Sequence, residues 1–257
     1  MLVNVLQRQP HEFIVIIFSF ILLFSVPAKA ENIKVVTEYL APYQVKNEDG
    51  SLGGFSTEVI HALFEITKDT ADIEVMPWSR AYEIALYQKN VLIYSIAHTK
   101  IRDPHFKWLG GLTRERLYFW GLKSKFTKKV DSIEELKSLR VAVSRRSNAE
   151  QFLLTNNYKK IYPLISDEKA MNMLSHNRVD LIIGAGLPVK IMTEQVDLQG
   201  DEVIKVYEIA DLGVDLSIAF NLSSDPVLVK RFQKAFKTLR KSGQLAVIQK
   251  KWGIHSE

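Results

Sequence analysis

The 257-residue sequence contains no cysteine. This absence excludes disulfide bonds, thiolate metal sites and cysteine nucleophiles, so the fold must be stabilised by its apolar core. The sequence also lacks a strong charge of one sign, because 34 basic residues stand against 29 acidic ones. The basic residues are scattered and no basic run is interleaved with aromatic residues, which argues against a nucleic-acid partner.

The longest apolar run covers residues 13–26 and is relieved only by two serines. Small residues follow it in Pro27-Ala28-Lys29-Ala30, at the spacing that a signal peptidase recognises. A helix of this length reaches about 21 Å, which is short of a hydrocarbon core of about 30 Å, so a secretory signal peptide is favoured over a membrane anchor. We expect cleavage after Ala30. Because no cysteine follows that site, we expect no lipid anchor and a freely diffusing protein in a bacterial periplasm.

Removal of residues 1–30 takes away two basic and one acidic side chain and leaves 227 residues with a net charge of +4. This length suffices for one large core or two small ones. Short β-rich runs alternate with amphipathic stretches, which predicts an α/β layered architecture. The predicted strands are residues 33–36, 73–76, 91–96, 117–121, 140–144, 161–164, 180–184, 203–208 and 214–221.

Helices are predicted from apolar stripes and capping residues. One covers residues 56–70. Two begin at Ser132 and Ser147, each followed three residues later by a glutamate, which is the spacing of a capping box. A long helix begins at Asp225, an N-cap residue followed by proline, and we expect Gly243 to end it before a last short helix at residues 245–252.

The order of these elements occurs twice. Residues 33–121 and residues 139–210 each fit the order strand, helix, strand, helix, strand. The helices after residue 225 have no obvious strand partners of their own. Two lobes, with the chain crossing between them, would explain this pattern.

The stretch from Ser95 to Trp108 is the strongest candidate for a binding site. An apolar strand ends there in hydroxyl and polar side chains and in Arg102. Such an ending can present several donors to an anion at one edge of a sheet. We interpret it as a carboxylate clamp, with the alternative that Arg102 is a surface residue paired with Asp103.

Four features follow one another along the chain: Tyr39-Leu40-Ala41-Pro42-Tyr43, Gly53-Gly54-Phe55 at the start of a helix, residues 95–102, and Val141-Ala142-Val143 before a helix. With these features in this order, the chain as a whole resembles the bacterial periplasmic solute-binding proteins of the polar amino acid transport family. The resemblance implies a type II periplasmic binding protein fold. In that fold two α/β lobes are joined by two hinge strands and close around a ligand, which is delivered to an ABC transporter.

The resemblance also implies the domain boundaries and the partners. Lobe 1 would comprise residues 31–120 and 215–257, and lobe 2 residues 121–214, with hinges near residues 119–122 and 212–216. We expect a monomer whose partners are a small carboxylate and an inner-membrane permease.

In lobe 1 the resemblance implies three ligand contacts. The arginine that grips the ligand α-carboxylate corresponds to Arg102, whose planar guanidinium can bond both carboxylate oxygens. Two positions that offer hydroxyl or backbone contacts correspond to Ser95 and Ala97. Ala97 has no hydroxyl and can contribute only its backbone amide.

In lobe 2 the resemblance implies contacts from the loop Arg145-Arg146-Ser147-Asn148, just before a helix. Helix N-termini carry unpaired amides and a partial positive charge, which favours an anion. Ser147 can be an N-cap and a neighbour of the ligand at once, while Asn148 follows it. Arg146 stands where the family usually has glycine, and its guanidinium would either bind a second acidic group or face solvent.

Gly186 departs from the family pattern. The resemblance implies an aspartate near this point that binds the ligand ammonium, whereas Gly184-Ala185-Gly186 carries no charge. Because a buried ammonium without a partner costs several kcal/mol, either another acid supplies the charge or the ligand lacks an α-amine. Glu38 is the best candidate for that acid, followed by Asp211 and Asp215. The glycines would also let the backbone approach a ligand closely.

Aromatic residues can form the walls of the site. Tyr39, Tyr43 and Trp78 follow predicted strands, where an open α/β lobe places its binding edge. We predict that Tyr39 and Trp78 contact the ligand, with core packing as the alternative. Trp108 and Trp120 are expected to pack in the core or at a hinge.

A metal enzyme is not indicated. His98 and His105 flank Arg102, but their spacing does not fit a helical ligand pair and no third ligand is evident. No serine has a nucleophile elbow around it. We therefore expect no metal and no cofactor.

The sequence thus predicts a non-catalytic periplasmic protein that binds a small carboxylate, an amino acid or a close relative, for an ABC transporter. The alternative is an enzyme resembling the cyclohexadienyl dehydratases, which use a carboxylic acid in the cleft of the same fold. Gly186 offers no such acid. A receptor ectodomain would need a second membrane span, which we do not expect.

Overall fold

A computed structural model describes residues 31–196, 198 and 201–254. The predicted signal peptide and the cleavage site after Ala30 lie outside these residues. None of the helices in the described part of the chain is both long and apolar enough to cross a membrane.

Two five-stranded sheets organise the chain, and the first has the strand order β4-β1-β5-β12-β6. Strand β1 pairs in parallel with β4 and β5, whereas β12 runs antiparallel to β5 and β6. A short hairpin of β2 and β3 follows β1. The bounds are β1 (Asn32–Thr37), β2 (Val45–Lys46), β3 (Leu52–Gly53), β4 (Thr70–Val75), β5 (Leu92–His98), β6 (Phe106–Glu115) and β12 (Val214–Asn221).

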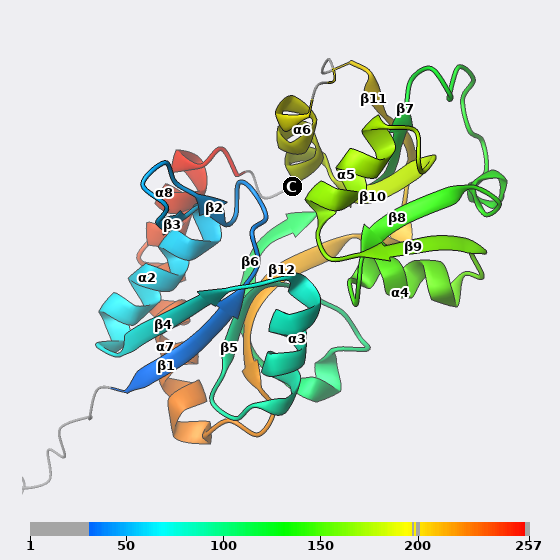
Figure 1. The fold of residues 1–257 in the computed structure, drawn as a ribbon. Coiled ribbons are helices and arrows are strands. Elements are labelled where there is room, and N and C mark those ends of the chain that lie inside the picture. Colours follow the sequence, from blue (N-terminus) through cyan, green and yellow to red (C-terminus); the bar gives the residue numbers. More distant parts are fainter. Residues whose placement is uncertain (1–30, 197, 199–200, 255–257) are drawn as a thin grey trace, which may run out of the picture. The chain divides into compact units, whose positions relative to one another are not determined.

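Helices cover both faces of this sheet (Figure 1). On one face lie α2 (Phe55–Thr67), α7 (Pro226–Lys241) and α8 (Gln244–Lys251), and on the other lies α3 (Trp78–Tyr87). The apolar stripe of α2 packs against Phe232 and Phe236 of α7 and against the strands. We call this sheet with its four helices the first lobe.

The second sheet has the order β11-β7-β10-β8-β9. Strands β8, β9 and β10 are parallel, and β7 runs antiparallel to β10 and β11. Helix α4 covers one face, and α5 and α6 cover the other; we call this sheet with these helices the second lobe. The bounds are β7 (Leu117–Leu122), β8 (Arg140–Ser144), α4 (Asn148–Thr155), β9 (Lys160–Leu164), α5 (Asp167–Ser175), β10 (Leu181–Ala185), α6 (Gly186–Gln195) and β11 (Val203–Glu208).

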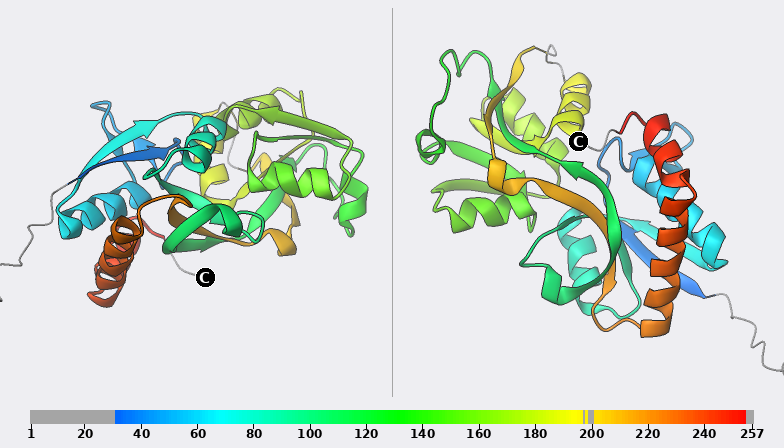
Figure 2. Two further views of the ribbon diagram at one scale, coloured as in Figure 1. Left: turned by 90° about the horizontal axis from the view of Figure 1, so that it is seen from below. Right: turned by 180° about the vertical axis from the view of Figure 1, so that it is seen from behind.

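The chain passes between the two sheets twice, from β6 to β7 and from β11 through the short 3₁₀ helix Ala210–Leu212 to β12. The long strands β6 and β12 run side by side, as Figure 2 shows from two further directions. The predicted two-lobed α/β fold is therefore confirmed. The predicted lobe boundaries, residues 31–120 with 215–257 and residues 121–214, stay a prediction.

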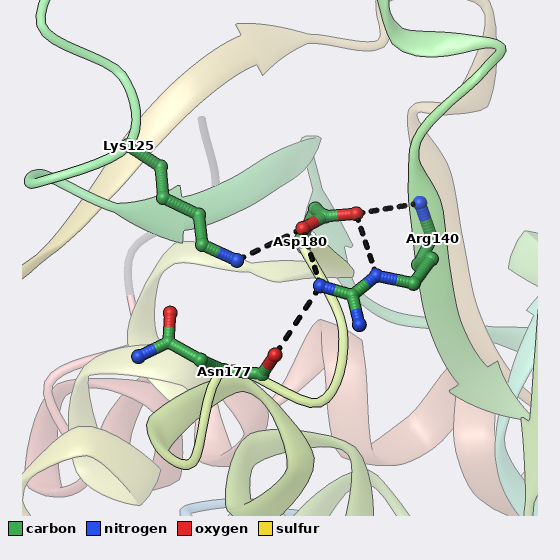
Figure 3. Close-up of polar contacts among 4 residues, drawn as sticks. All are labelled: Lys125, Arg140, Asn177 and Asp180. Atoms are coloured by element: carbon green, nitrogen blue, oxygen red, sulfur yellow. Dashed lines mark hydrogen bonds and ion pairs between the residues drawn. The ribbon is translucent and has the colours of Figure 1, made fainter.

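An ion-pair cluster joins neighbouring strands of the second sheet (Figure 3). Asp180 accepts hydrogen bonds from the backbone N–H and the guanidinium of Arg140 at 2.8–3.0 Å and from Lys125 Nζ at 2.9 Å. Arg140 also donates to the Asn177 carbonyl. These donors hold the pKa of the Asp180 carboxyl well below its usual range. The cluster ties the start of β8 to the turn that leads into β10.

Several elements lie where the sequence places them. The strands at residues 140–144, 203–208 and 214–221 have the predicted bounds, and α7 begins after the N-cap Asp225 as expected. Ser132 forms the predicted capping box with Glu135, but the helix that follows is a single 3₁₀ turn, Ile133–Leu136. Ser147 caps α4, although the Glu150 carboxylate accepts from the N–H of Arg146 rather than from that of Ser147.

Strand β6 is absent from the sequence prediction. Gly110 and Gly111 interrupt its apolar residues, and Gly110 has a φ of 152°. A Cβ at Gly110 would lie 2.3 Å from a ring carbon of Phe236, so glycine is required there by the close packing of α7. The strand forms through its pairing with β12, which local sequence does not reveal.

Candidate functional site

Both lobes line one cavity of about 90 Å³, which we call the inner cavity. The elements of the first lobe supply Glu38, Leu40, Trp78, Ser95, Ala97, Arg102, Glu115, Val214 and Leu216, and those of the second supply Leu117, Ser144, Ser147, Asn148, Ala149, Asp167, Ile183, Gly184, Ala185, Pro188 and Met192. Seven residues predicted for the site are among them, namely Glu38, Trp78, Ser95, Ala97, Arg102, Ser147 and Asn148. Of the other three, Tyr39 and Gly186 lie outside this lining, and Arg146 reaches the site through its backbone.

Arg102 is a buried residue of the cavity wall, with 3% of its surface exposed. The chain turns after β5, where the N–H of Arg102 donates to the Thr99 carbonyl, and this turn directs the side chain inward. The guanidinium donates to the Ala97 carbonyl at 3.0 Å and lies 5.3 Å and 4.9 Å from the ring centroids of Trp78 and Tyr82. Burial lowers the pKa of Arg102, but a guanidinium stays charged at neutral pH.

Ser95 and Ala97 lie at the carboxyl end of β5, where they line the cavity and also hold neighbouring side chains in place. Ser95 has a φ of 55°, and its hydroxyl donates to Ser56 and accepts from Gln44. Ala97 holds Arg102 through its carbonyl. The unusual backbone at Ser95 coincides with a register shift between β5 and β12, which bends the strand at the cavity.

Ser147 and Asn148 bring the N-terminus of α4 to the cavity. The Ser147 hydroxyl accepts from the N–H of Glu150 at 3.0 Å, which is an ordinary N-cap bond. The side-chain Nδ2 of Asn148 is buried and has no hydrogen-bond partner within the described residues. Because leaving a buried donor unpaired costs about 1–3 kcal/mol, this N–H group indicates a site for an acceptor in the cavity.

Arg146 contributes its backbone carbonyl to the cleft. That oxygen accepts from Arg102 at 3.2 Å and from Trp78 Nε1 at 3.1 Å, so it joins the second lobe to the first. The guanidinium of Arg146 points elsewhere and pairs with Glu83 at 3.1 Å. A φ of 61° at Arg146 directs the carbonyl in this way.

Two acidic side chains line the cavity, one from each lobe. Glu38 follows β1, and Asp167 is the first residue of α5, where it accepts a hydrogen bond from the Ser144 hydroxyl. Burial raises the pKa of both carboxyls, and the proximity of Asp167 raises that of Glu38 further, while Arg102 opposes this shift. A cation placed between them would relieve both the repulsion and the cost of burial.

A third acid, Glu115, lies at the end of β6 and accepts a hydrogen bond from the hydroxyl of Tyr43. Burial raises the pKa of Glu115 to about 7, against the lowering effect of the Tyr43 bond. Tyr43 is therefore held by this contact and by packing against Phe55, and it does not line the inner cavity.

The remaining predicted residues lie away from the inner cavity. Tyr39 has half of its surface exposed. Gly186 lies at the start of α6 and lines a second, outer cavity of about 290 Å³. Asp211 and Asp215, the other acids considered for a ligand amine, are exposed and are not part of either lining.

Sequence reasoning missed Asp167 and Glu115. An acid directly after the N-cap Ser166 has the appearance of an ordinary first-turn residue of a helix. One signal could have identified Asp167, namely its place after β9, because ligands bind outside the carboxyl ends of parallel strands. Glu115 ends the strand that the sequence prediction omitted, so no local signal marked it.

His98, one of the two histidines beside Arg102, has structural contacts. It stacks on Trp108 with ring centroids 3.9 Å apart and pairs with Asp103, the residue predicted as the alternative partner of Arg102. Within the described residues, no group of three or more His, Asp or Glu side chains could hold a metal ion.

Solved structures place this arrangement among known folds. A histidine kinase sensor domain with similarity to periplasmic binding proteins superposes with a TM-score of 0.77 at 18% identity, over 87% of this chain and 96% of that one. This chain has the fold of the periplasmic binding proteins. No family model and no curated protein sequence matches it.

Two further structures share the periplasmic binding protein fold. A periplasmic binding protein of Salmonella typhimurium with high arginine specificity has a TM-score of 0.75 at 16% identity, over 87% of this chain and 99% of that one. An ancestral amino acid-binding protein, described as a precursor of cyclohexadienyl dehydratase, has a TM-score of 0.70 at 18% identity, over 86% and 94%. At these identities the likeness establishes the fold alone.

Proposed function

We propose that this protein binds a small zwitterion, an amino acid or a close derivative, in the cavity between its lobes. One observation carries the proposal: the cavity combines a buried cation and an unpaired amide donor with two partly buried acids. Arg102 and Asn148 would hold the ligand carboxylate, and Glu38 and Asp167 its ammonium. The ligand-contact roles of Ser95, Ala97, Ser147 and Trp78 remain part of this proposal.

Glu38 and Asp167 supply the negative charge for a ligand ammonium that Gly186 does not provide. A ligand ammonium in a dry site needs a negative partner, and Glu38 and Asp167 supply one from each lobe. Since each lobe would hold both an acidic and a donor group, ligand contacts would favour the arrangement in which both lobes face the cavity. Closure of two domains around a hinge is the usual consequence of such shared contacts.

The fold and the predicted signal peptide support a role in the periplasm. Solved relatives in fold include an arginine-binding periplasmic protein and an ancestral amino acid-binding protein. We propose that the protein is exported, that it acts as a monomer, and that its ligand-bound form delivers the amino acid to an ABC transporter in the inner membrane. No cofactor is needed for this role.

Thermal unfolding with a panel of amino acids tests the proposal. A ligand at one hundred times its dissociation constant adds about 2.7 kcal/mol to the free energy of unfolding, which shifts the melting temperature measurably. We expect at least one free amino acid to raise the melting temperature and mass spectrometry of the purified protein to identify it or a relative. If neither free amino acids nor their derivatives shift the transition, the proposal is wrong.

A second candidate is a dehydratase-like enzyme, and the raised pKa of the Asp167 carboxyl favours it. A carboxyl whose pKa is raised by burial can keep its proton and act as a general acid. Asp167 faces the cavity from the second lobe, the side on which the sequence showed no such acid at Gly186. Conversion of prephenate by the purified protein, abolished in Asp167→Asn, would establish this function in place of binding alone.

A further inference from the structure

The outer cavity of about 290 Å³ adjoins the inner one, because Glu115 and Ala185 line both. The inner cavity of about 90 Å³ is smaller than the outer one, and in the proposed function it holds the α-carbon of the ligand with its carboxylate and ammonium. A longer ligand would extend past Glu115 into the outer cavity.

The charged groups of the outer cavity are mostly basic. Its lining includes Arg114, Arg116 and Lys205, with Glu115 as the acidic member. Arg116 pairs with Glu208 at 3.4 Å, which offsets part of its charge. Glu115 accepts from Tyr43 and has a pKa raised to about 7, so much of its charge is absent near neutral pH. An anion is therefore favoured over a cation in this space.

Lys205 is the cation that the surrounding residues position best. Its Nζ lies 3.9 Å from the ring centroid of Tyr118 and 5.6 Å from that of Trp120. The Trp120 ring is itself held by a hydrogen bond from its Nε1 to the Gly184 carbonyl at 3.0 Å. No acidic side chain in the described part of the protein forms an ion pair with Lys205. The Tyr118 and Trp120 rings thus hold the Lys205 ammonium in place, and its charge remains available to a ligand.

Gly186 leaves the space beside this cation open. A Cβ at position 186 would lie 3.9 Å from Lys205 Nζ, so any side chain there would stand directly beside the ammonium. Glycine places neither a side chain nor a charge beside the Lys205 ammonium. The same position that lacks an acid for a ligand amine therefore borders a group suited to a ligand anion.

We propose that the ligand is an amino acid with a second anionic group at the far end of its side chain, bound by Lys205 in the outer cavity. This inference rests on the proposed function, because it takes the α-carboxylate and ammonium to occupy the inner cavity. The distal group is a carboxylate or a phosphonate-like anion, since both present oxygen acceptors to an ammonium.

Calorimetry with matched probes tests this inference. L-2-Aminoadipate, L-norleucine and L-lysine share the α-amino acid part and differ at the end of a chain of similar length, while 2-amino-5-phosphonopentanoate distinguishes a phosphonate from a carboxylate. We expect one of the two anionic probes to bind at least tenfold more tightly than norleucine and lysine. Lys205→Met should reduce that ratio to about one without changing the affinity for norleucine.

Lys160→Met provides the control, because Lys160 is an exposed lysine at the start of β9 and lines neither cavity. It should keep the preference for the anionic probe. Equal binding of norleucine and both anionic probes, or a preference that survives Lys205→Met, would overturn the inference and leave the proposed function intact. Failure of every α-amino acid to bind would contradict both.

Discussion

The guanidinium of Arg102 donates a 3.2 Å hydrogen bond to the backbone carbonyl of Arg146 and thereby joins the two lobes at the edge of the cavity. The same carbonyl accepts from Trp78 Nε1 at 3.1 Å. Two donors from the first lobe thus converge on one acceptor of the second. These bonds stabilise the arrangement in which both lobes face a ligand.

Trp78→Phe should weaken ligand binding without unfolding the protein. Phenylalanine keeps an aromatic face for Arg102 but removes the Nε1 donor that reaches Arg146. We expect a loss of about 0.5–1.5 kcal/mol, the usual net value of one hydrogen bond, or up to about tenfold in affinity by calorimetry. The matched control is Trp108→Phe, since Trp108 stacks on His98 outside the inner cavity. Equal losses in both variants would contradict the role of the lobe contact.

Arg146→Gly should retain ligand affinity within about threefold. The substitution keeps the backbone carbonyl, and glycine adopts the positive φ of this position without the cost that a side chain incurs. The lost ion pair with Glu83 is half exposed and contributes at most about 1 kcal/mol, so the free energy of unfolding should change by no more than that. A loss of more than tenfold in affinity would show that the guanidinium itself contacts the ligand.

Asp167→Asn should weaken the binding of a ligand that carries an ammonium by about 2–5 kcal/mol, because it removes one partner of a buried charge pair. The same variant should bind the deaminated analogue of that ligand at least as well as the parent protein does. Glu168→Gln is the control, since Glu168 is the exposed neighbour on α5. Calorimetry that finds equal losses for the amino acid and its deaminated analogue would exclude Asp167 as the ammonium partner.

Glu115→Gln should flatten the pH dependence of stability. Burial raises the pKa of Glu115 from an ordinary 4.5 to about 7, so between these values the folded protein holds a proton that the unfolded chain has lost. The contribution of the protonated Glu115 carboxyl to the free energy of unfolding is fully present below pH 4.5 and is lost as the pH rises to about 7, with a total change of a few kcal/mol. Urea unfolding across this range should show the free energy of unfolding of the parent protein falling with pH relative to that of Glu115→Gln, and parallel curves would refute the shift.

The sequence predicted the bounds of β8, β11 and β12 and the starts of α4 and α7 well, because these depend on local signals. The strand at residues 140–144 is an apolar run bounded by polar residues, and Asp225 before Pro226 marks the start of α7. Capping at Ser147 is equally local. Strand β6 depends on pairing with β12 and on the packing of Phe236 over Gly110, so its sequence alone did not reveal it.

The residues of the site also divide into those that a sequence signal marks and those that only the fold brings to the site. Arg102 is marked by the strand end that carries it and Asn148 by the family resemblance, and the structure brings both into one cavity. Asp167 resembles an ordinary first-turn acid, and its place after β9 is the one signal that sets it apart. Lys205 gave no signal, since a single lysine in a strand becomes distinctive only beside Tyr118 and Trp120.

The most direct test of the proposed zwitterion site compares one stabilising amino acid with its carboxamide in the parent protein and in Arg102→Ala, by calorimetry. The parent protein should bind the free acid, and the variant should lose about 2–5 kcal/mol for it because Asn148 alone cannot replace the guanidinium. The carboxamide should bind weakly to both proteins. Unchanged affinity of Arg102→Ala for the free acid, or equal binding of acid and carboxamide by the parent, would contradict a carboxylate held at Arg102.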